Sequence, residues 1–225
     1  VDRDGVGGAA VLTDVVPSKT LIATAEVMTL VSGSTELGVR YPGGAGSVGV
    51  DLGAVNRRVK SLAQAQSADI LARLGKEGVR VVGGTGRLEG AGRVIVDDAD
   101  GVPGATAAFD ADTVLVATGA HPRRLPDAMP DGERILSWTQ LYDLEELPQR
   151  LVVVGSGVTG AEFASAYNAL GSDVVLVSSR DRVLPGEDAD AAAVLEAVFA
   201  RRGVTVVPRS RAEAVKNTGD GVEVR

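Results

Sequence analysis

Three glycines, Gly155, Gly157 and Gly160, lie between an apolar segment and a segment with helical periodicity. In a dinucleotide-binding turn the first glycine makes the tight turn, the second lets the backbone approach a pyrophosphate, and the third lets the helix pack closely on the strand. The N–H groups that open the helix, at Val158 and Thr159, would then face the phosphates. The spacing therefore predicts a pyrophosphate-binding turn. The alternative, an ordinary tight turn of an α/β sheet, is disfavoured by the flanking elements.

The end of the next predicted strand indicates which nucleotide is accepted. An acidic residue normally stands about 20 positions after such a turn and binds a ribose 2′-hydroxyl. Here Ser178 takes that place, and Arg180 and Arg182 follow it. A guanidinium can hold a phosphate through two parallel hydrogen bonds. We therefore expect NADPH to be used at least as well as NADH. The open alternative is that the two arginines are solvent-exposed at the strand end and bind no ligand.

The elements that must position these residues alternate between strands and helices. Apolar strands are expected over residues 151–154, 174–177 and 204–207, with helices over 161–170 and 190–202. This alternation predicts an α/β fold with a parallel, doubly wound sheet. Upstream, the patterns predict helices over residues 17–30, ending at Gly33, and 51–78, and strands over 79–82, 93–96, 105–109 and 113–116.

Composition restricts the chemistry that is available. The chain has 225 residues, 44% of them hydrophobic and 24% charged, which indicates a globular fold of one large or two small domains. With no cysteine and one histidine, thiolate catalysis and a clustered Cys/His metal site are excluded. The net charge of −7 disfavours a nucleic-acid surface. No unbroken apolar stretch is long enough for a membrane span, so a cytoplasmic location is expected.

Two further segments carry a family resemblance. Residues 7–19, Gly-Gly-Ala-Ala-Val-Leu-Thr-Asp-Val-Val-Pro-Ser-Lys, resemble the redox-active disulfide segment of the flavoprotein disulfide reductases, the family of dihydrolipoamide dehydrogenase. Residues 113–119, Thr-Val-Leu-Val-Ala-Thr-Gly, are similar to the strand that touches the flavin in that family. Ala10 and Val15 stand where the family has its two cysteines. The chain therefore most resembles the branch without the disulfide, the lipoamide-dehydrogenase-like NAD(P)H quinone reductases.

The resemblance implies two cofactors, FAD and either NADPH or NADH, and it assigns residues to them. Lys19 matches the lysine beside the flavin N5, and Glu162 matches its acidic partner, so an ion pair between them, across the two domains, is expected. A lysine there would stabilise negative charge that develops on the flavin. The other residues implied to bind the cofactors are Asp2 at the adenosine ribose, Gly7 and Gly8 beside the flavin, Gly86 and Arg87 near the adenine, and Ala117, Thr118 and Gly119 along the flavin.

The resemblance also implies a domain organisation and an activity. Residues 1–120 would form a partial FAD-binding domain with an antiparallel excursion near 88–110, residues 121–150 a linker, and residues 151–225 a partial NAD(P)-binding domain, both domains Rossmann-like. The implied activity passes electrons from NAD(P)H through FAD to a small acceptor, with a quinone favoured, in a full-length homodimer. Two alternatives stay open: a dihydrolipoamide-dehydrogenase-like protein without dithiol activity, and a non-catalytic nucleotide-binding module.

The family's FAD-binding turn would lie upstream of Asp2. We therefore expect the 225 residues alone to bind FAD poorly. His121 is expected to be a plain loop residue and not a catalytic base.

Overall fold

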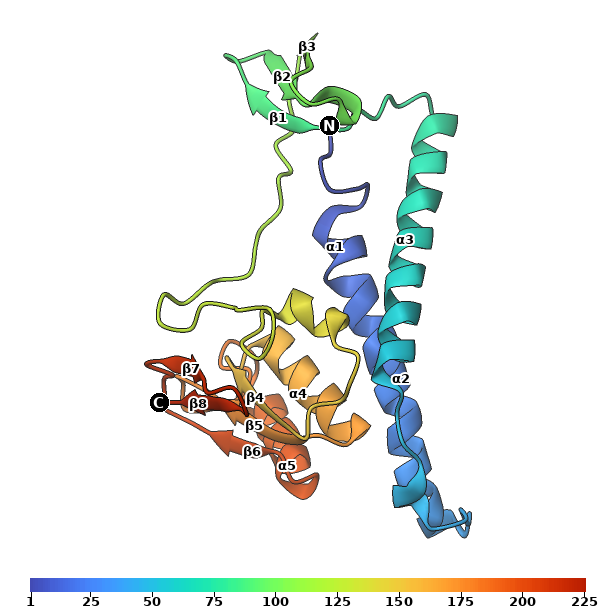
Figure 1. The fold of residues 1–225 in the computed structure, drawn as a ribbon, viewed down its shortest axis with the longest axis vertical. Helices are drawn as coiled ribbons and strands as arrows, with labels where there is room; N and C mark the ends of the chain where they lie inside the picture. The colour runs from blue at the N-terminus through green and yellow to red at the C-terminus, as the bar shows by residue number, and fades with distance from the viewer. The chain divides into compact units, whose positions relative to one another are not determined.

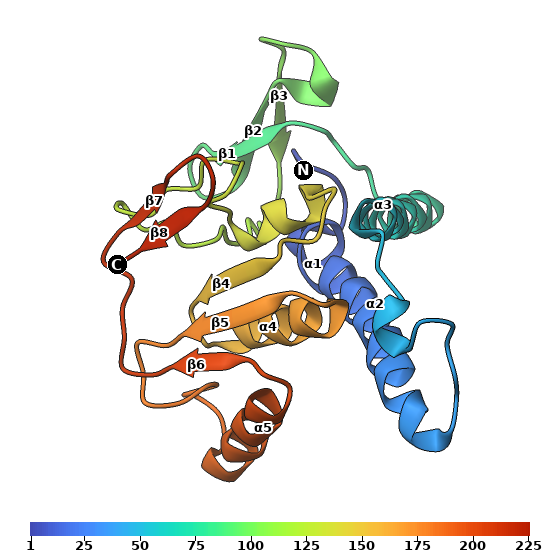
Figure 2. The same cartoon turned by 60° about the horizontal axis from the view of Figure 1, so that its bottom comes forward.

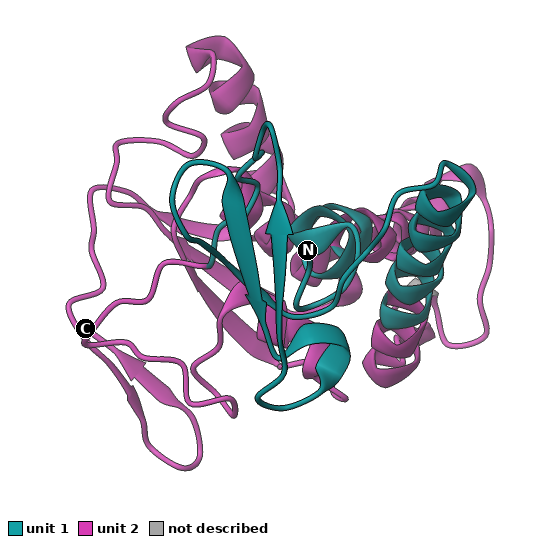
Figure 3. Cartoon of the chain, turned by 90° about the horizontal axis from the view of Figure 1, so that it is seen from above, with its two compact units in different colours: residues 1–17, 60–121 teal, residues 18–59, 122–225 magenta. Residues whose placement is uncertain are grey.

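The computed structural model describes residues 1–225, apart from the side chain of residue 45, and the chain divides into two compact units (Figure 3). Unit 1 comprises Val1–Pro17 and Lys60–His121, and unit 2 comprises Ser18–Val59 and Pro122–Arg225. This division differs from the sequence-based one, which gave residues 18–59 to the first domain and made 121–150 a linker. Both segments belong to unit 2.

Unit 2 contains the parallel sheet that was expected. Strands β4, β5 and β6 lie side by side in that order and are linked by helices (Figure 2). The elements are β4 (Arg150–Val154), α4 (Val158–Leu170), β5 (Asp173–Val177), α5 (Ala189–Arg201) and β6 (Thr205–Val207). The register pairs Val154 with Val177, and Val177 with Val207. The carboxyl ends of all three strands therefore meet at one edge, directly before the glycine turn, residues 155–160.

The core of unit 2 packs around α4. Tyr167 and Phe199 are fully buried, and Leu21 and Val59 from the two long helices join the same cluster. The Tyr167 hydroxyl donates to the carbonyl oxygen of Leu141 at 3.3 Å, and burial raises the pKa of this phenol. Leu141 belongs to the 3₁₀ helix η4 (Trp138–Asp143). Part of the predicted linker is therefore core, because its apolar side chains cover the sheet.

Besides the 3₁₀ helices η1 (Thr35–Leu37) and η2 (Ala45–Ser47), unit 2 contains parts of two long helices and a hairpin. They are α2 (Val15–Ser34), whose first three residues belong to unit 1, α3 (Leu52–Lys76), which continues into unit 1 from Lys60, and the hairpin β7 (Val215–Asn217) and β8 (Val222–Val224) (Figure 1). The Asp51 carboxylate accepts the N–H of Ala54 at 2.8 Å and so caps α3. Gly78, at φ +74°, ends it as expected.

Unit 1 contains the antiparallel excursion that was expected. Its three strands pair in the order β1-β2-β3, and its core includes Val96 and Ile95. The guanidinium of Arg80 lies 5.1 Å from the centroid of the Phe109 ring. The elements are α1 (Gly8–Leu12), β1 (Thr85–Leu88), β2 (Arg93–Asp97) and β3 (Thr106–Asp110).

Three sequence-based expectations are wrong. Helix α2 continues through Gly33 to Ser34, so this glycine does not end it. Residues 79–82 and 113–116 form no strand, although Asp2 makes an isolated parallel bridge with Gly83. An apolar run becomes a strand only when another strand pairs with it, and residues 113–116 find no such partner among the described residues. Leu115 is accordingly 88% exposed.

The segment Gly8–Leu37 is long and apolar enough to cross a membrane by length and composition alone. The sequence analysis missed it because small and hydroxyl-bearing residues interrupt its apolar runs. The core helix of a soluble protein meets the same criteria, and α2 buries Leu21 and Ala25. The absence of a membrane span stays a prediction.

Candidate functional site

Each glycine of the glycine turn has its own structural reason. Gly155 has φ +115°, a conformation that L side chains rarely adopt. At Gly160 a Cβ atom would lie 1.8 Å from the carbonyl oxygen of Gly155, so the start of α4 packs on the turn at a distance only glycine allows. At Gly157 a Cβ would meet nothing within 4 Å. The middle glycine therefore leaves open the space that a pyrophosphate backbone contact requires.

The start of α4 is suited to an anion. Gly157 is its N-cap residue and supplies no side-chain hydrogen bond. The N–H groups of Val158, Thr159 and Gly160 have no intrahelical acceptor at this position. Open N–H groups and the helix dipole together favour negative charge here.

Ser178 is placed differently from what a ribose-binding residue requires. Its side chain is fully buried, and its hydroxyl lies 2.7 Å from the hydroxyl of Ser156 in the glycine turn. The same oxygen accepts the N–H of Arg180 at 3.1 Å and lies 3.2 Å from the Arg182 carbonyl oxygen. Ser178 therefore braces the turn against the end of β5. Sequence reasoning missed Ser156, because the pairing follows from the strand register and not from either serine alone.

The two arginines after β5 differ in accessibility. Arg180 is exposed, and its guanidinium makes no ion pair with any described residue. Arg182 is partly buried: its Nε is buried without a hydrogen-bond partner among the described residues, and Nη2 lies 3.5 Å from the Glu187 carbonyl oxygen. Of the two, only Arg180 offers a free donor fork to a ligand at the carboxyl edge of the sheet.

Lys19 and Glu162 form the expected ion pair. Nζ of Lys19 donates to Oε1 of Glu162, and the two side chains are 56% and 28% exposed. Lys19 lies on the first turns of α2, and Glu162 lies on α4, two residues after Gly160. Both belong to unit 2, so the expectation that the pair joins two domains is wrong, because the start of α2 from Ser18 onwards belongs to the same compact unit as α4. Ser18 lines a small pocket together with Glu162, and Leu21 of α2 and Phe163 of α4 belong to one buried cluster beside the pair. The pair therefore holds the Lys19 ammonium of α2 beside α4, the helix that opens at the glycine turn.

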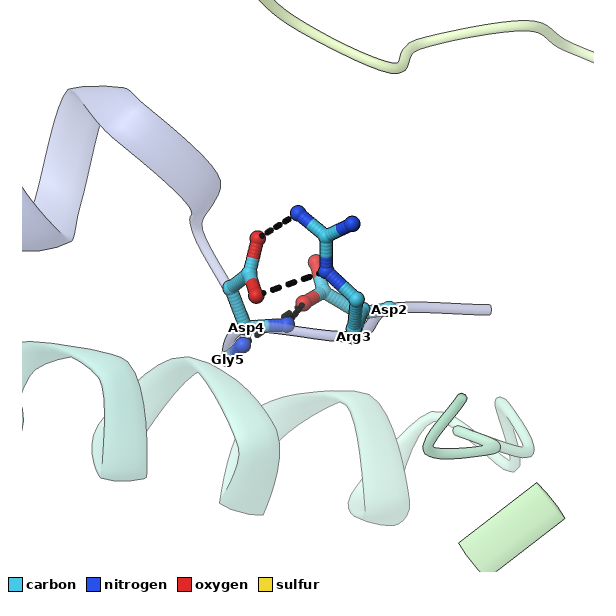
Figure 4. A network of polar contacts seen from close by, with 4 residues as sticks. All are labelled: Asp2, Arg3, Asp4 and Gly5. Atoms are coloured by element: carbon cyan, nitrogen blue, oxygen red, sulfur yellow. Dashed lines mark hydrogen bonds and ion pairs between the residues drawn. The ribbon is translucent and has the colours of Figure 1, made fainter. Parts of the chain in front are cut away.

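In unit 1, Asp2 organises the first turn of the chain (Figure 4). Its Oδ1 accepts the N–H groups of Asp4 at 3.0 Å and Gly5 at 2.7 Å, and its backbone bridges Val82 and Gly84. Oδ2 makes no hydrogen bond with the described residues. Arg3 donates two hydrogen bonds to Asp4, which lower the pKa of that carboxyl. One oxygen of Asp2 is thus committed to the turn and one is open to a ligand.

The other predicted site residues of unit 1 lie on turns and edges. Gly7, at φ +100°, is the N-cap of α1, where a Cβ would lie 2.5 Å from Val11, and Gly8 has φ +54° with open space. Arg87 donates to Asp97 at 3.0 Å, so β1 and β2 hold its guanidinium, and Gly86 is on the same strand. The remaining three, Ala117, Thr118 and Gly119, are exposed and outside regular structure.

No group of three or more His, Cys, Asp or Glu side chains that could hold a metal ion occurs within the described residues. His121 is exposed in a segment without regular structure.

Comparison with known proteins identifies the family of the chain. The family model of the pyridine nucleotide-disulphide oxidoreductases matches residues 3–225. A Mycobacterium tuberculosis protein named NAD(P)H dehydrogenase (quinone) is 52% identical over 228 residues, which cover 100% of this chain and 46% of that protein. A dihydrolipoyl dehydrogenase of Chlorobaculum tepidum is 32% identical over 222 residues, 99% of this chain and 46% of its own length.

Solved structures of related proteins have a similar fold. LpdA from Mycobacterium tuberculosis has a TM-score of 0.89 and 51% identity over 100% of this chain and 48% of that chain. The flavoprotein disulfide reductase RclA from Escherichia coli shares the fold, with a TM-score of 0.79 and 20% identity over 99% of this chain and 46% of that chain. The chain spans about half the length of these relatives. It belongs to the pyridine nucleotide-disulphide oxidoreductase family.

Proposed function

We propose that this chain is the nucleotide-binding part of a flavoprotein that oxidises NADPH or NADH and passes the electrons through FAD to a quinone. One observation carries the proposal. Helix α4 begins at an uncapped glycine turn suited to a pyrophosphate, and on the same helix Glu162 holds the ammonium of Lys19. The predicted nucleotide site and the carboxylate that positions the cation thus lie on one helix, an arrangement suited to electron transfer from a nicotinamide.

The residues present fit both cofactors. The space at Gly157 and the N–H groups of α4 accommodate the pyrophosphate of NAD(P)H. Asp2 keeps one carboxylate oxygen open for the adenosine ribose of FAD, and the open backbone at Gly8 allows close approach. When bound, the flavin supplies the transfer of electrons between nicotinamide and acceptor. Lys19 supplies positive charge, and Glu162 keeps its ammonium in one place.

A quinone suits this chain better than a disulfide substrate. Reduction of a disulfide proceeds by attack of a thiolate, and this chain has no cysteine. Ala10 lies on α1 and Val15 begins α2, at the two positions where the family resemblance places cysteines. The relative named NAD(P)H dehydrogenase (quinone) points to the same acceptor class. Dihydrolipoamide-dehydrogenase-like chemistry would need a thiol from outside these residues.

The choice of nicotinamide cofactor follows from the end of β5. No carboxylate stands at Ser178, so the main electrostatic barrier to a 2′-phosphate is missing. We propose that both NADPH and NADH are used. The cytoplasmic location and the homodimer of the full-length protein also remain proposals.

The test uses the purified, flavin-loaded full-length protein and compares a quinone with lipoamide as acceptor, at saturating NADPH and then NADH. Turnover with the quinone and none with lipoamide is the expected result. Robust lipoamide reduction would overturn the acceptor assignment. Nucleotide binding without turnover of any acceptor would favour the non-catalytic module.

A further inference from the structure

The carboxyl ends of β5 and β6 carry a pair of arginines that the nucleotide fold does not need. Past the last strand pair, Ser178 N–H donates to the Val207 carbonyl oxygen at 2.9 Å, and Arg209 N–H donates to the Arg180 carbonyl oxygen at 2.8 Å. The backbones of Arg180 and Arg209, 29 positions apart in sequence, are therefore directly bonded at this edge.

The backbone at Arg209 is unusual. Ser210 N–H, and not that of Arg209, donates to the Ser178 carbonyl oxygen at 2.8 Å, so Arg209 is an extra residue in the pairing. It has φ +50°, in the left-handed region that non-glycine residues rarely adopt. Extra residues at strand ends re-aim side chains, and residues held in such conformations gather at functional sites.

Both guanidinium groups are available to a ligand. Arg180 and Arg209 are exposed, and neither makes an ion pair within the part of the chain that the structure describes. Asp181, exposed and next to Arg180, is the acidic residue beside them in sequence. Arg182 is the poorer second donor, because its Nε is buried and its Nη2 lies 3.5 Å from the Glu187 carbonyl oxygen.

We propose that Arg209 acts with Arg180 as a second donor to the 2′-phosphate of NADPH, and so helps determine cofactor specificity. The inference rests on the proposed function, because it concerns the nucleotide bound at the glycine turn. A phosphate monoester has three acceptor oxygens, so two donor forks from adjacent strands can bind it together. An arginine in this position has no comparable partner on NADH, whose adenosine ribose carries a 2′-hydroxyl in place of the phosphate.

The experiment measures binding to the flavin-loaded holoenzyme by calorimetry, with adenosine 2′,5′-bisphosphate and 5′-AMP as probes that differ only in the 2′-phosphate. The key variant is Arg209→Gly, since glycine keeps the left-handed backbone while the guanidinium is removed. Arg209→Lys keeps the charge but loses the fork. Arg201→Ala is the matched control: it removes the same charge at the end of α5, before β6.

We expect Arg209→Gly to weaken binding of the bisphosphate about tenfold, the loss of one charge-assisted donor, and to leave 5′-AMP binding unchanged. Arg209→Lys should lose part of that affinity, and Arg201→Ala should match the wild type. Equal weakening of both probes by Arg209→Gly, or no effect on either, would overturn the inference and leave the proposed function standing. Failure of the wild type to bind either probe or either nicotinamide cofactor would overturn the proposed function itself.

Discussion

Replacing either of two glycines in the glycine turn by alanine should have opposite consequences. At Gly160 the new Cβ would lie 1.8 Å from the Gly155 carbonyl oxygen and 2.9 Å from its carbonyl carbon. Both are backbone atoms, so no rotamer change relieves the overlap. At Gly157 the Cβ meets nothing within 4 Å, and φ −72° with ψ −175° is an extended conformation that alanine adopts freely.

The magnitudes follow from these contacts. Overpacking typically lowers the free energy of unfolding by about 1–3 kcal/mol. Because the clash in Gly160→Ala is with backbone atoms, we expect a loss of about 3 kcal/mol or more. For a protein of 150–250 residues each kcal/mol lowers the Tm by about 2–4 °C, so a fall of about 6 °C or more is expected. Gly157→Ala should leave the Tm unchanged or raise stability by about 0.4–1 kcal/mol, because alanine has less freedom in the unfolded chain.

The assay is thermal unfolding of the 225-residue protein, together with titration of NADPH. Gly157→Ala should fold normally and bind NADPH more weakly, since its methyl group occupies space meant for the pyrophosphate. Gly160→Ala should lower the Tm before any nucleotide is added. Equal Tm values for the two variants, or wild-type NADPH affinity in Gly157→Ala, would refute the roles assigned to these glycines.

Three further perturbations test other parts of the structure. Lys19→Met should leave FAD bound but slow flavin reduction about tenfold, a modest loss because the Lys19 side chain is half exposed. Stopped-flow rates of flavin reduction check this, and an unchanged rate would show that the ion pair has no role in the reaction. The Asp131 carboxylate accepts hydrogen bonds from the backbone N–H groups of Glu133, Ile135 and Arg134 and from the side-chain amide of Asn217. These bonds lower the pKa of the carboxyl in the folded protein. The stabilisation that they provide is therefore present above the ordinary Asp pKa of about 3.9 and is lost as the pH falls below it. The Tm difference between wild type and Asp131→Asn should therefore shrink on acidification, and a difference that grows would contradict this. Tyr167→Phe should lower the free energy of unfolding by about 1 kcal/mol through the loss of one neutral hydrogen bond, and Tyr167→Ala should lower it by about 3–5 kcal/mol. Denaturant unfolding measures both, and equal losses would show that burial of the ring does not stabilise the fold.

Local patterns predicted the nucleotide-binding part of the fold well. The strands and helices from Arg150 to Val207 follow from apolar runs and helical periodicity, and the glycine spacing carries its own steric reasons. These features depend on residues close in sequence. They could therefore be predicted before any long-range packing was known.

Features that depend on distant residues could not be predicted in this way. Residues 113–116 look like a strand, but strand formation depends on a pairing partner that their own sequence does not reveal. The buried pair of Ser156 and Ser178 requires the register of β4 and β5. The ion pair of Lys19 and Glu162, 143 positions apart, came from family resemblance and not from the residue pattern.

The most direct test of the proposed function follows the flavin absorbance of the purified protein in anaerobic stopped flow. Mixing with NADPH, and separately with NADH, should bleach the flavin, and a quinone added in a second mixing step should restore the absorbance while lipoamide should not. If neither nicotinamide cofactor bleaches the flavin, or if lipoamide restores it as fast as the quinone, the account is contradicted.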